Sequence, residues 1–196
     1  MLLRFFATAV CVIAMAGLAR AQTHENPFRF GTALSGFAGG AADTEGTTAA
    51  AGLELGWEIT RRLAVQGNTL WTAPGNGQHD FAVMLGPKIN LKRTGRGVPF
   101  VSAGIGMYRA TFDSLAGPLP PFYSHRLTPA QRLDTGGSFD DFVASIGGGA
   151  EFFVHAHWAV RPDVRVMTVF GNSDVRWVTA FGGSIAYHFE RHRTSE

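Results

Sequence analysis

Eight stretches of this sequence alternate between apolar and polar residues, and this alternation constrains the fold more than any other feature. Successive side chains on a β-strand point to opposite faces, so each stretch predicts a strand with one apolar and one polar face. The 25 Gly and nine Pro residues disfavour a helical fold, because both types destabilise helix interiors. The stretches cover residues 28–35, 51–59, 63–71, 80–91, 101–108, 144–152, 158–170 and 175–189.

The first 21 residues have the pattern of a secretory signal peptide. Arg4 precedes an apolar run over 5–18, and Ala19 and Ala21 form an A-x-A site that predicts cleavage before Gln22. The alternative is an uncleaved anchor helix, although this run is shorter than the roughly 20 residues that span a bilayer. Cys11, the single cysteine, lies within the run, so the mature chain is expected to have neither a disulfide nor a cysteine metal site.

Charge and hydropathy narrow the class of protein. Loss of Arg4 and Arg20 with the leader leaves 15 basic and 15 acidic residues, so no basic surface for nucleic acid is predicted. Only 16% of the residues are charged, well below the usual quarter for soluble domains. No apolar run after Ala21 is long enough for a spanning helix, and the other structure that crosses a bilayer is a closed β-barrel.

The connections between the stretches are arranged as they are in outer-membrane barrels. The longest, 111–138, belongs to the odd-numbered set, and outer-membrane barrels have short periplasmic turns and longer outer loops. We therefore predict an all-β fold, a closed eight-stranded antiparallel transmembrane up-and-down barrel. It is expected to occupy residues 22–189, after the leader at 1–21 and before a short polar tail at 190–196.

The polar faces are rich in Gly, Ala and Ser, and the apolar faces carry aromatic residues near the strand ends. Small residues suit the inside of a narrow barrel, so we expect the apolar face to contact lipid. A soluble periplasmic ligand-binding barrel is the alternative, with its apolar face inside. Aromatic girdles are predicted from Trp57, Phe152, Trp158, Tyr187 and Phe189 at the periplasmic rim and from Trp71, Phe170 and Trp177 at the outer rim.

The inward face carries equal numbers of acidic and basic side chains. Eight strands leave an interior just wide enough for side chains, and a buried charge without a partner is costly. We therefore expect these charges to pair and fill the lumen; a gated ion path is the alternative. The predicted lumen charge network is Arg29, Glu54, Glu58, Asp80, Lys88, Glu151, Arg161, Asp163, Arg165 and Arg176.

The last predicted strand resembles the C-terminal assembly signal of bacterial outer-membrane barrels, in which a glycine precedes alternating apolar residues and a final aromatic. The matching residues are Gly183, Ile185, Tyr187 and Phe189. Residues 146–153 with 158–161 resemble the penultimate hairpin of the OmpA-type small outer-membrane β-barrel domain family, and 99–106 resembles its fifth strand. One departure is that the chain continues past Phe189, where such barrels often end.

The resemblance covers residues 28–189 and implies an eight-stranded barrel in the cell outer membrane. The implied partners of the protein are outer-membrane lipid, lipopolysaccharide and the barrel assembly machinery. The protein is expected to be a monomer that binds no nucleic acid. No set of residues has a catalytic pattern, and no cofactor or metal is expected.

The sequence therefore favours a non-catalytic barrel with a structural or surface-interaction role. The long loop, with Arg126 and Arg132, is a candidate for recognising a partner or lipopolysaccharide phosphates, or it is a disordered surface loop. A lipid A-modifying enzyme is the alternative, and it would need His79, Asp80 and Ser138 to meet at the outer rim.

The orientation of the faces is testable by labelling, because the mature chain is expected to lack cysteine. Single cysteines at Leu55, Val83, Ile105 and Val164 should react with a lipid-restricted thiol reagent and not with a water-soluble one. Protection from both reagents in a protein that stays soluble would show that the apolar face points inward.

Overall fold

The computed structural model describes residues 31–60, 62–75, 77–92, 96–113, 121–124, 126, 137–155, 157–172 and 174–189. Its elements are β1 Thr32–Ala42, β2 Thr47–Glu58, β3 Leu63–Gly75, β4 Gln78–Asn90, β5 Gly97–Phe112, α2 Pro121–Ser124, β6 Gly137–Phe153, β7 Trp158–Phe170 and β8 Val175–His188. The predicted leader, the polar tail and Arg29 lie outside the described residues.

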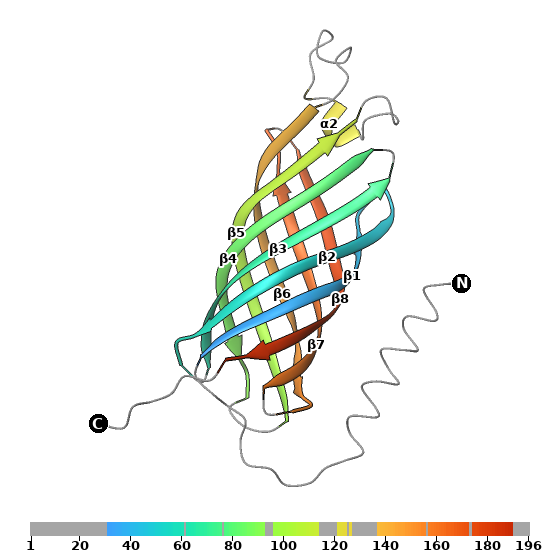
Figure 1. Ribbon diagram of the computed structural model, residues 1–196. Helices are drawn as coiled ribbons and strands as arrows, with labels where there is room; N and C mark the ends of the chain where they lie inside the picture. The colour runs from blue at the N-terminus through green and yellow to red at the C-terminus, as the bar shows by residue number, and fades with distance from the viewer. Residues whose placement is uncertain are drawn as a thin grey trace.

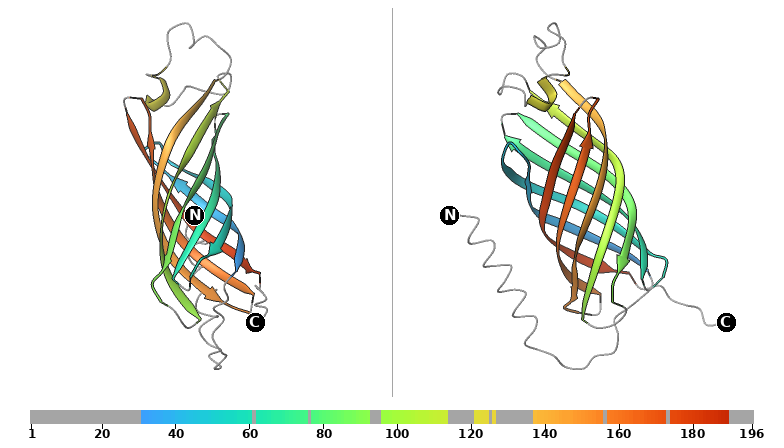
Figure 2. Two further views of the ribbon diagram at one scale, coloured as in Figure 1. Left: turned by 90° about the vertical axis from the view of Figure 1, so that its left-hand side faces the viewer. Right: turned by 180° about the vertical axis from the view of Figure 1, so that it is seen from behind.

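The eight strands form one closed antiparallel barrel, which confirms the predicted fold class (Figure 1). Each strand pairs with the next in sequence, and β1 pairs with β8 to close the sheet. If the register pairs are followed from Thr32 once around the barrel, they return to β1 at Ala42, ten residues farther along the strand. This stagger is the reason that the strands tilt steeply, as the two views in Figure 2 show.

The strands are longer at the outer end than the alternation predicted. β1 continues through predicted loop residues to Ala42, and β3 and β4 meet in a tight turn in which Gly77 has a φ of 71°. The loop predicted at 111–138 is shorter at both ends, because β5 runs to Phe112 and β6 begins at Gly137. At 39–42 all four residues are Gly or Ala, so the strand has no polarity contrast for the sequence analysis to detect.

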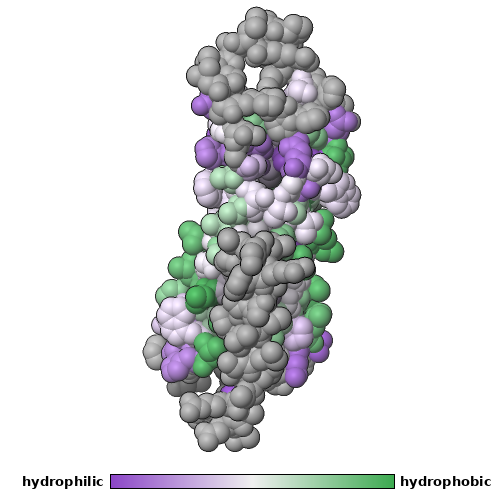
Figure 3. All heavy atoms as spheres, turned by 90° about the vertical axis from the view of Figure 1, so that its right-hand side faces the viewer, coloured by the Kyte–Doolittle hydropathy of each residue, from purple (hydrophilic) through white to green (hydrophobic). Residues whose placement is uncertain are grey.

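The outer wall is apolar and nearly all charged side chains of the described strands point into the lumen, as in a barrel that faces lipid. Leu55 and Ile105 are 55% and 61% exposed, whereas Glu54 and Glu151 are buried in the interior. Of the Asp, Glu, Lys and Arg residues on the described strands, only Arg109 and Asp140 lie on the outer face. Figure 3 shows hydrophobic atoms along the flanks of the wall and hydrophilic atoms toward its ends. A soluble ligand-binding barrel has the opposite arrangement.

Helices contribute little to the described part of the chain. α2 has four residues, and no described helix has the length and apolarity needed to cross a membrane.

Inward-facing glycines allow the wall to curve tightly. A Cβ atom on Gly106 would lie 1.8 Å from the Val83 carbonyl oxygen, and one on Gly86 would lie 2.0 Å from that of Ala103. These contacts are with the backbone of the neighbouring strand, so rotation of a side chain cannot relieve them. The small residues of the polar face are therefore required by the approach of the strands as well as by the width of the lumen.

We predict that Gly106→Ala lowers the free energy of unfolding by roughly 1–3 kcal/mol or more, since the added methyl forces backbone shifts. Gly36→Ala is the matched control, because a Cβ atom there meets nothing within 4 Å. Urea titration of the refolded barrels, followed by migration on unboiled gels, measures both. Equal stability of the two variants would contradict the steric argument.

Candidate functional site: the barrel lumen and its outer mouth

The lumen is filled by three layers of side chains along the barrel axis. On β3 the inward residues change from Asn68 to Leu70 to Thr72, that is, from polar to apolar and back to polar. On β8 the apolar Val178 lies directly below Arg176. The apolar layer is formed by Leu70, Met84, Val143, Met167, Val169 and Val178. It separates two polar layers, which we name the periplasmic layer and the outer layer after the ends that the sequence analysis predicts to face the periplasm and the outside.

A bidentate ion pair organises the upper part of the periplasmic layer. Arg161 on β7 donates to both carboxylate oxygens of Glu54 on β2, at 2.6 and 2.7 Å, across the lumen. Arg165 donates to Asn68 at 2.6 Å and to Glu54 at 3.4 Å. Arg161 Nε also lies 3.4 Å from Asp163. Two acids and two bases are thus joined in one cluster among strands that are distant in sequence.

A second cluster lies nearer the periplasmic end. The Lys88 ammonium is 3.3 Å from Glu151, and His188 Nε2 is 3.1 Å from the other oxygen of the same carboxylate. The Phe100 ring lies between the two clusters, 4.6 Å from Lys88 Nζ and 5.3 Å from the Arg161 guanidinium. The aromatic face provides a favourable environment for both cations.

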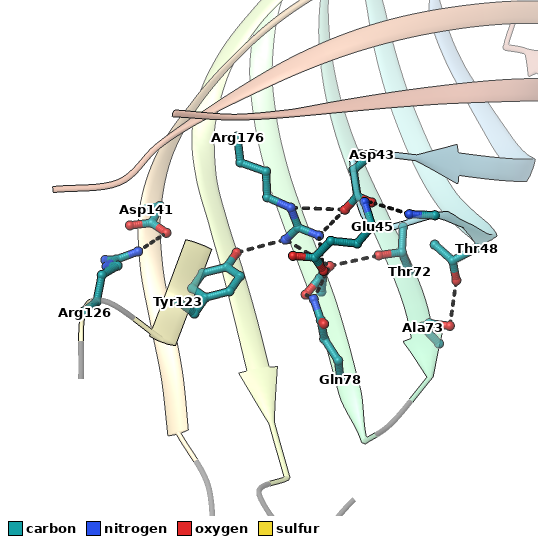
Figure 4. A network of polar contacts seen from close by, with 12 residues as sticks. Asp43, Glu45, Thr48, Thr72, Ala73, Gln78, Tyr123, Arg126, Asp141 and Arg176 are labelled. Carbon is teal, nitrogen blue, oxygen red and sulfur yellow. Dashed lines mark hydrogen bonds and ion pairs between the residues drawn. The ribbon is translucent and has the colours of Figure 1, made fainter. Parts of the chain in front are cut away.

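Arg176 is the centre of the outer polar layer (Figure 4). Its guanidinium pairs with Asp43 of the β1–β2 connection and lies 3.9 Å from Asp80 on β4. It also donates to the Tyr123 hydroxyl at 3.2 Å. Asp80 accepts a further hydrogen bond from Gln78 at 2.9 Å. Asp43, Asp80 and Tyr123 are therefore connected to one another through one arginine.

The short helix α2 caps this mouth from the long loop. The Tyr123 side chain is fully buried, with its ring centroid 4.8 Å from that of Phe112 and 5.0 Å from that of Phe139. Burial raises the pKa of the Tyr123 phenol, so it stays a neutral acceptor for Arg176. Arg126 follows the helix, pairs with Asp141 at 2.7 Å and lies over the Phe139 ring. The base of the loop is therefore held against the barrel.

The structure places every described member of the predicted lumen network on the inner face. Glu58, Asp163 and Arg165 are partly buried, and the fully buried members are Glu54, Asp80, Lys88, Glu151, Arg161 and Arg176. Among the described acids of the predicted network, Glu58 alone has no ion pair to a described base. The aromatic residues predicted for the girdles lie on the outer wall, where Tyr187 is half-buried among Trp158 and Phe189.

Several residues of these clusters were not predicted from the sequence. Asp43 and Tyr123 lie in connections, where alternation gives no signal. His188 was recognised as polar but not as a partner of Glu151. Asp141 was detectable, because it lies ten residues before Glu151 on the same strand and therefore on the same face. Continuing the period of two toward the loop would have found it.

The residues considered for lipid A chemistry do not meet. His79 is exposed on the outer wall and stacks on Trp71, whereas Asp80 is buried in the lumen beside Gln78. Ser138 lies on the outer face of β6, two strands away from His79 by way of Thr111. Within the described residues, no group of three His, Cys, Asp or Glu side chains is arranged to hold a metal ion.

Comparison with known proteins agrees with this architecture. A family model described as outer membrane protein beta-barrel domain matches residues 7–189. Neisserial surface protein A is similar in structure, with a TM-score of 0.59 and 11% identity, over 81% of this chain and 96% of that one. The N-terminal barrel of Pseudomonas aeruginosa OprF has a TM-score of 0.53 and 15% identity, over 79% and 97%. No curated protein matches the sequence significantly.

We predict that Arg161→Met destabilises the barrel by roughly 3–5 kcal/mol, because it leaves Glu54 buried with a weakened partnership. The double variant Glu54→Gln with Arg161→Met should recover most of that loss. Denaturant titration of the four proteins of this cycle gives the coupling energy. Arg109→Ala is the control, since its pair with Asp140 is exposed and its loss should change stability little. Additive effects of the two lumen substitutions would contradict the coupling.

Proposed function

Because this chain belongs to the outer membrane protein beta-barrel domain family, we propose that it is a non-catalytic, non-conducting outer-membrane barrel whose role is performed by its outer surface. The observation that carries this proposal is the filled lumen. Two ion-paired layers are separated by packed apolar side chains, and the outer layer is capped by Tyr123. In a barrel filled in this way, the loops and the outer wall are the surfaces that can bind a partner.

The outer end supplies the surface for such a role. Arg126 is engaged with Asp141, so it acts in holding the loop rather than in recognising lipopolysaccharide phosphates. Arg132 lies outside the described residues and remains a candidate for that contact. On the wall, the exposed Arg109–Asp140 pair lies beside outward aromatics that include Phe142. This boundary between apolar and charged side chains suits the outer leaflet, and we propose outer-membrane lipid and lipopolysaccharide as its partners.

The periplasmic end supports the proposed route of insertion. In β8 the outward Ile185 is 61% exposed, and Phe189 is also exposed while its backbone N–H donates to Thr32 at 2.8 Å. Gly183 and Tyr187 complete the predicted assembly signal on the strand that closes the barrel. We propose that the barrel assembly machinery recognises this strand and that the inserted barrel is a monomer.

We predict that the refolded protein gives no sustained open-channel conductance in planar bilayers. Tyr123→Ala should stay closed, because the apolar layer below the mouth remains. Leu70→Ser with Met167→Ser should produce measurable openings, because it makes that layer polar. Current recording with a known porin as the positive control tests this. Sustained conductance of the wild type would contradict the proposal.

The same reconstituted barrel tests the non-catalytic part of the proposal in a second arm. Vesicles containing lipid A are incubated with the protein, and the lipid is analysed by mass spectrometry. An unchanged acyl-chain profile is expected. A gain or loss of an acyl chain that depends on folded protein would replace the proposal with an enzymatic function.

A further inference from the structure

Charged and imidazole side chains on the outer wall are confined to one sector near its outer end. Among the described strand residues that face outward, these side chains are His79 on β4, Arg109 on β5 and Asp140 on β6, and all three are exposed. The three strands are consecutive neighbours in the sheet. The charge of the wall is therefore gathered in one place.

The register arranges this sector in three rows across β4, β5 and β6. Residues within a row pair directly, so the Cβ atoms of neighbours in a row are about 5 Å apart. From the outer end inward, the rows are His79, Thr111 and Ser138, then Phe81, Arg109 and Asp140, then Val83, Met107 and Phe142. We call these residues the outer-rim sector. Its side chains change from hydroxyl and imidazole, through charged, to apolar within about 13 Å of strand.

The charged pair at the centre of the sector keeps hydrogen-bonding capacity for a further molecule. Arg109 Nε and Nη2 donate to the two carboxylate oxygens of Asp140 at 2.7 and 2.8 Å. The two side chains remain 57% and 43% exposed. A guanidinium has five N–H groups, of which this pair uses two, and each carboxylate oxygen can accept a second hydrogen bond. The pair therefore presents donors and acceptors side by side to a molecule that lies against the wall.

Exposed aromatic rings flank the charged pair on both sides. Trp71 on β3 extends the middle row, because it pairs with Phe81, and its ring stacks on that of His79 with 6.1 Å between the centroids. On the other side, Phe142 packs against Phe170 of β7, with 5.7 Å between the ring centroids. Polar groups that both donate and accept, placed beside exposed rings, suit a ligand that has hydroxyl groups and C–H faces, as a sugar does.

We propose that the outer-rim sector binds the sugar headgroup of lipopolysaccharide, with the acyl chains of the same molecule along the apolar row. A sugar hydroxyl both donates and accepts hydrogen bonds, so it can satisfy Arg109 and Asp140 together. A headgroup that offers only anionic acceptors would satisfy the guanidinium but be repelled by the carboxylate. This inference rests on the proposed partnership with lipopolysaccharide and deepens it, because it names the part that is recognised and the residues that recognise it.

The test compares retention of lipid A with retention of phosphatidylglycerol, an anionic lipid without a sugar ring, by the refolded protein in detergent micelles. Native mass spectrometry counts the lipid molecules retained as the lipid concentration rises. We expect about tenfold tighter retention of lipid A, which corresponds to one hydrogen bond to a charged group. The double variant Arg109→Met with Asp140→Leu should lose this preference, and it leaves the net charge of the protein unchanged.

Threonine variants provide a matched control for the position of the sector. Thr111→Val removes a hydroxyl from its first row and should weaken retention of lipid A about threefold. Thr47→Val removes an outward hydroxyl at the outer end of β2, three strands away from β5, and should leave retention unchanged. All of these side chains are exposed, so the variants should refold, and migration on unboiled gels checks that they do.

Each outcome identifies which proposal fails. Equal retention of lipid A by the wild type and the double variant would overturn the assignment of the sector and leave the partnership with lipopolysaccharide standing. Equal retention of lipid A and phosphatidylglycerol by the wild type would overturn recognition of the sugar. An equal loss in Thr111→Val and Thr47→Val would overturn the location. If the wild type retains no lipid A, the proposed partnership fails together with this inference, whereas the conductance experiment is unaffected.

Discussion

Closure of the sheet is the constraint on which the rest of this structure depends. A strand that crosses a bilayer has no water to satisfy its backbone, so every N–H and C=O group needs a partner on a neighbouring strand. Pairing of β1 with β8 removes the two free edges and meets this requirement around the whole wall. With only eight strands the wall curves tightly, and glycines such as Gly86 and Gly106 are needed where neighbouring backbones approach.

The narrow lumen that results governs the charges inside it. Because the interior is excluded from bulk water, each ionised group there needs a counter-charge, and a cross-lumen pair such as Arg161–Glu54 provides one. The pairs also join strands that are distant in sequence, so they couple opposite sides of the wall. Phe100 lies between two cations and links the two periplasmic clusters. The side chains that fill the lumen therefore both neutralise one another's charges and pack against one another.

The charged groups at the two ends of the barrel are partnered differently. At the outer mouth, Arg176 binds a connection, a strand and α2 together, so that the loop covers its own charges. At the periplasmic mouth, Glu58 has no comparable partner in the described part of the chain. This difference directs attention to the outer loops for recognition.

The sequence alone determined the class of fold and the direction of each strand face, because alternation is a local property that tertiary contacts do not change. It also identified Glu54 and Arg161 as inward residues, since they share a face with small side chains. It did not determine which charges pair, because the partners are 107 residues apart and meet only when the barrel closes at its particular stagger. It also missed Asp43 and Tyr123, whose positions depend on how connections fold back over the mouth. The strand ends at 39–42 escaped detection because Gly and Ala on both faces carry no polarity signal, although the backbone ladder continues through them.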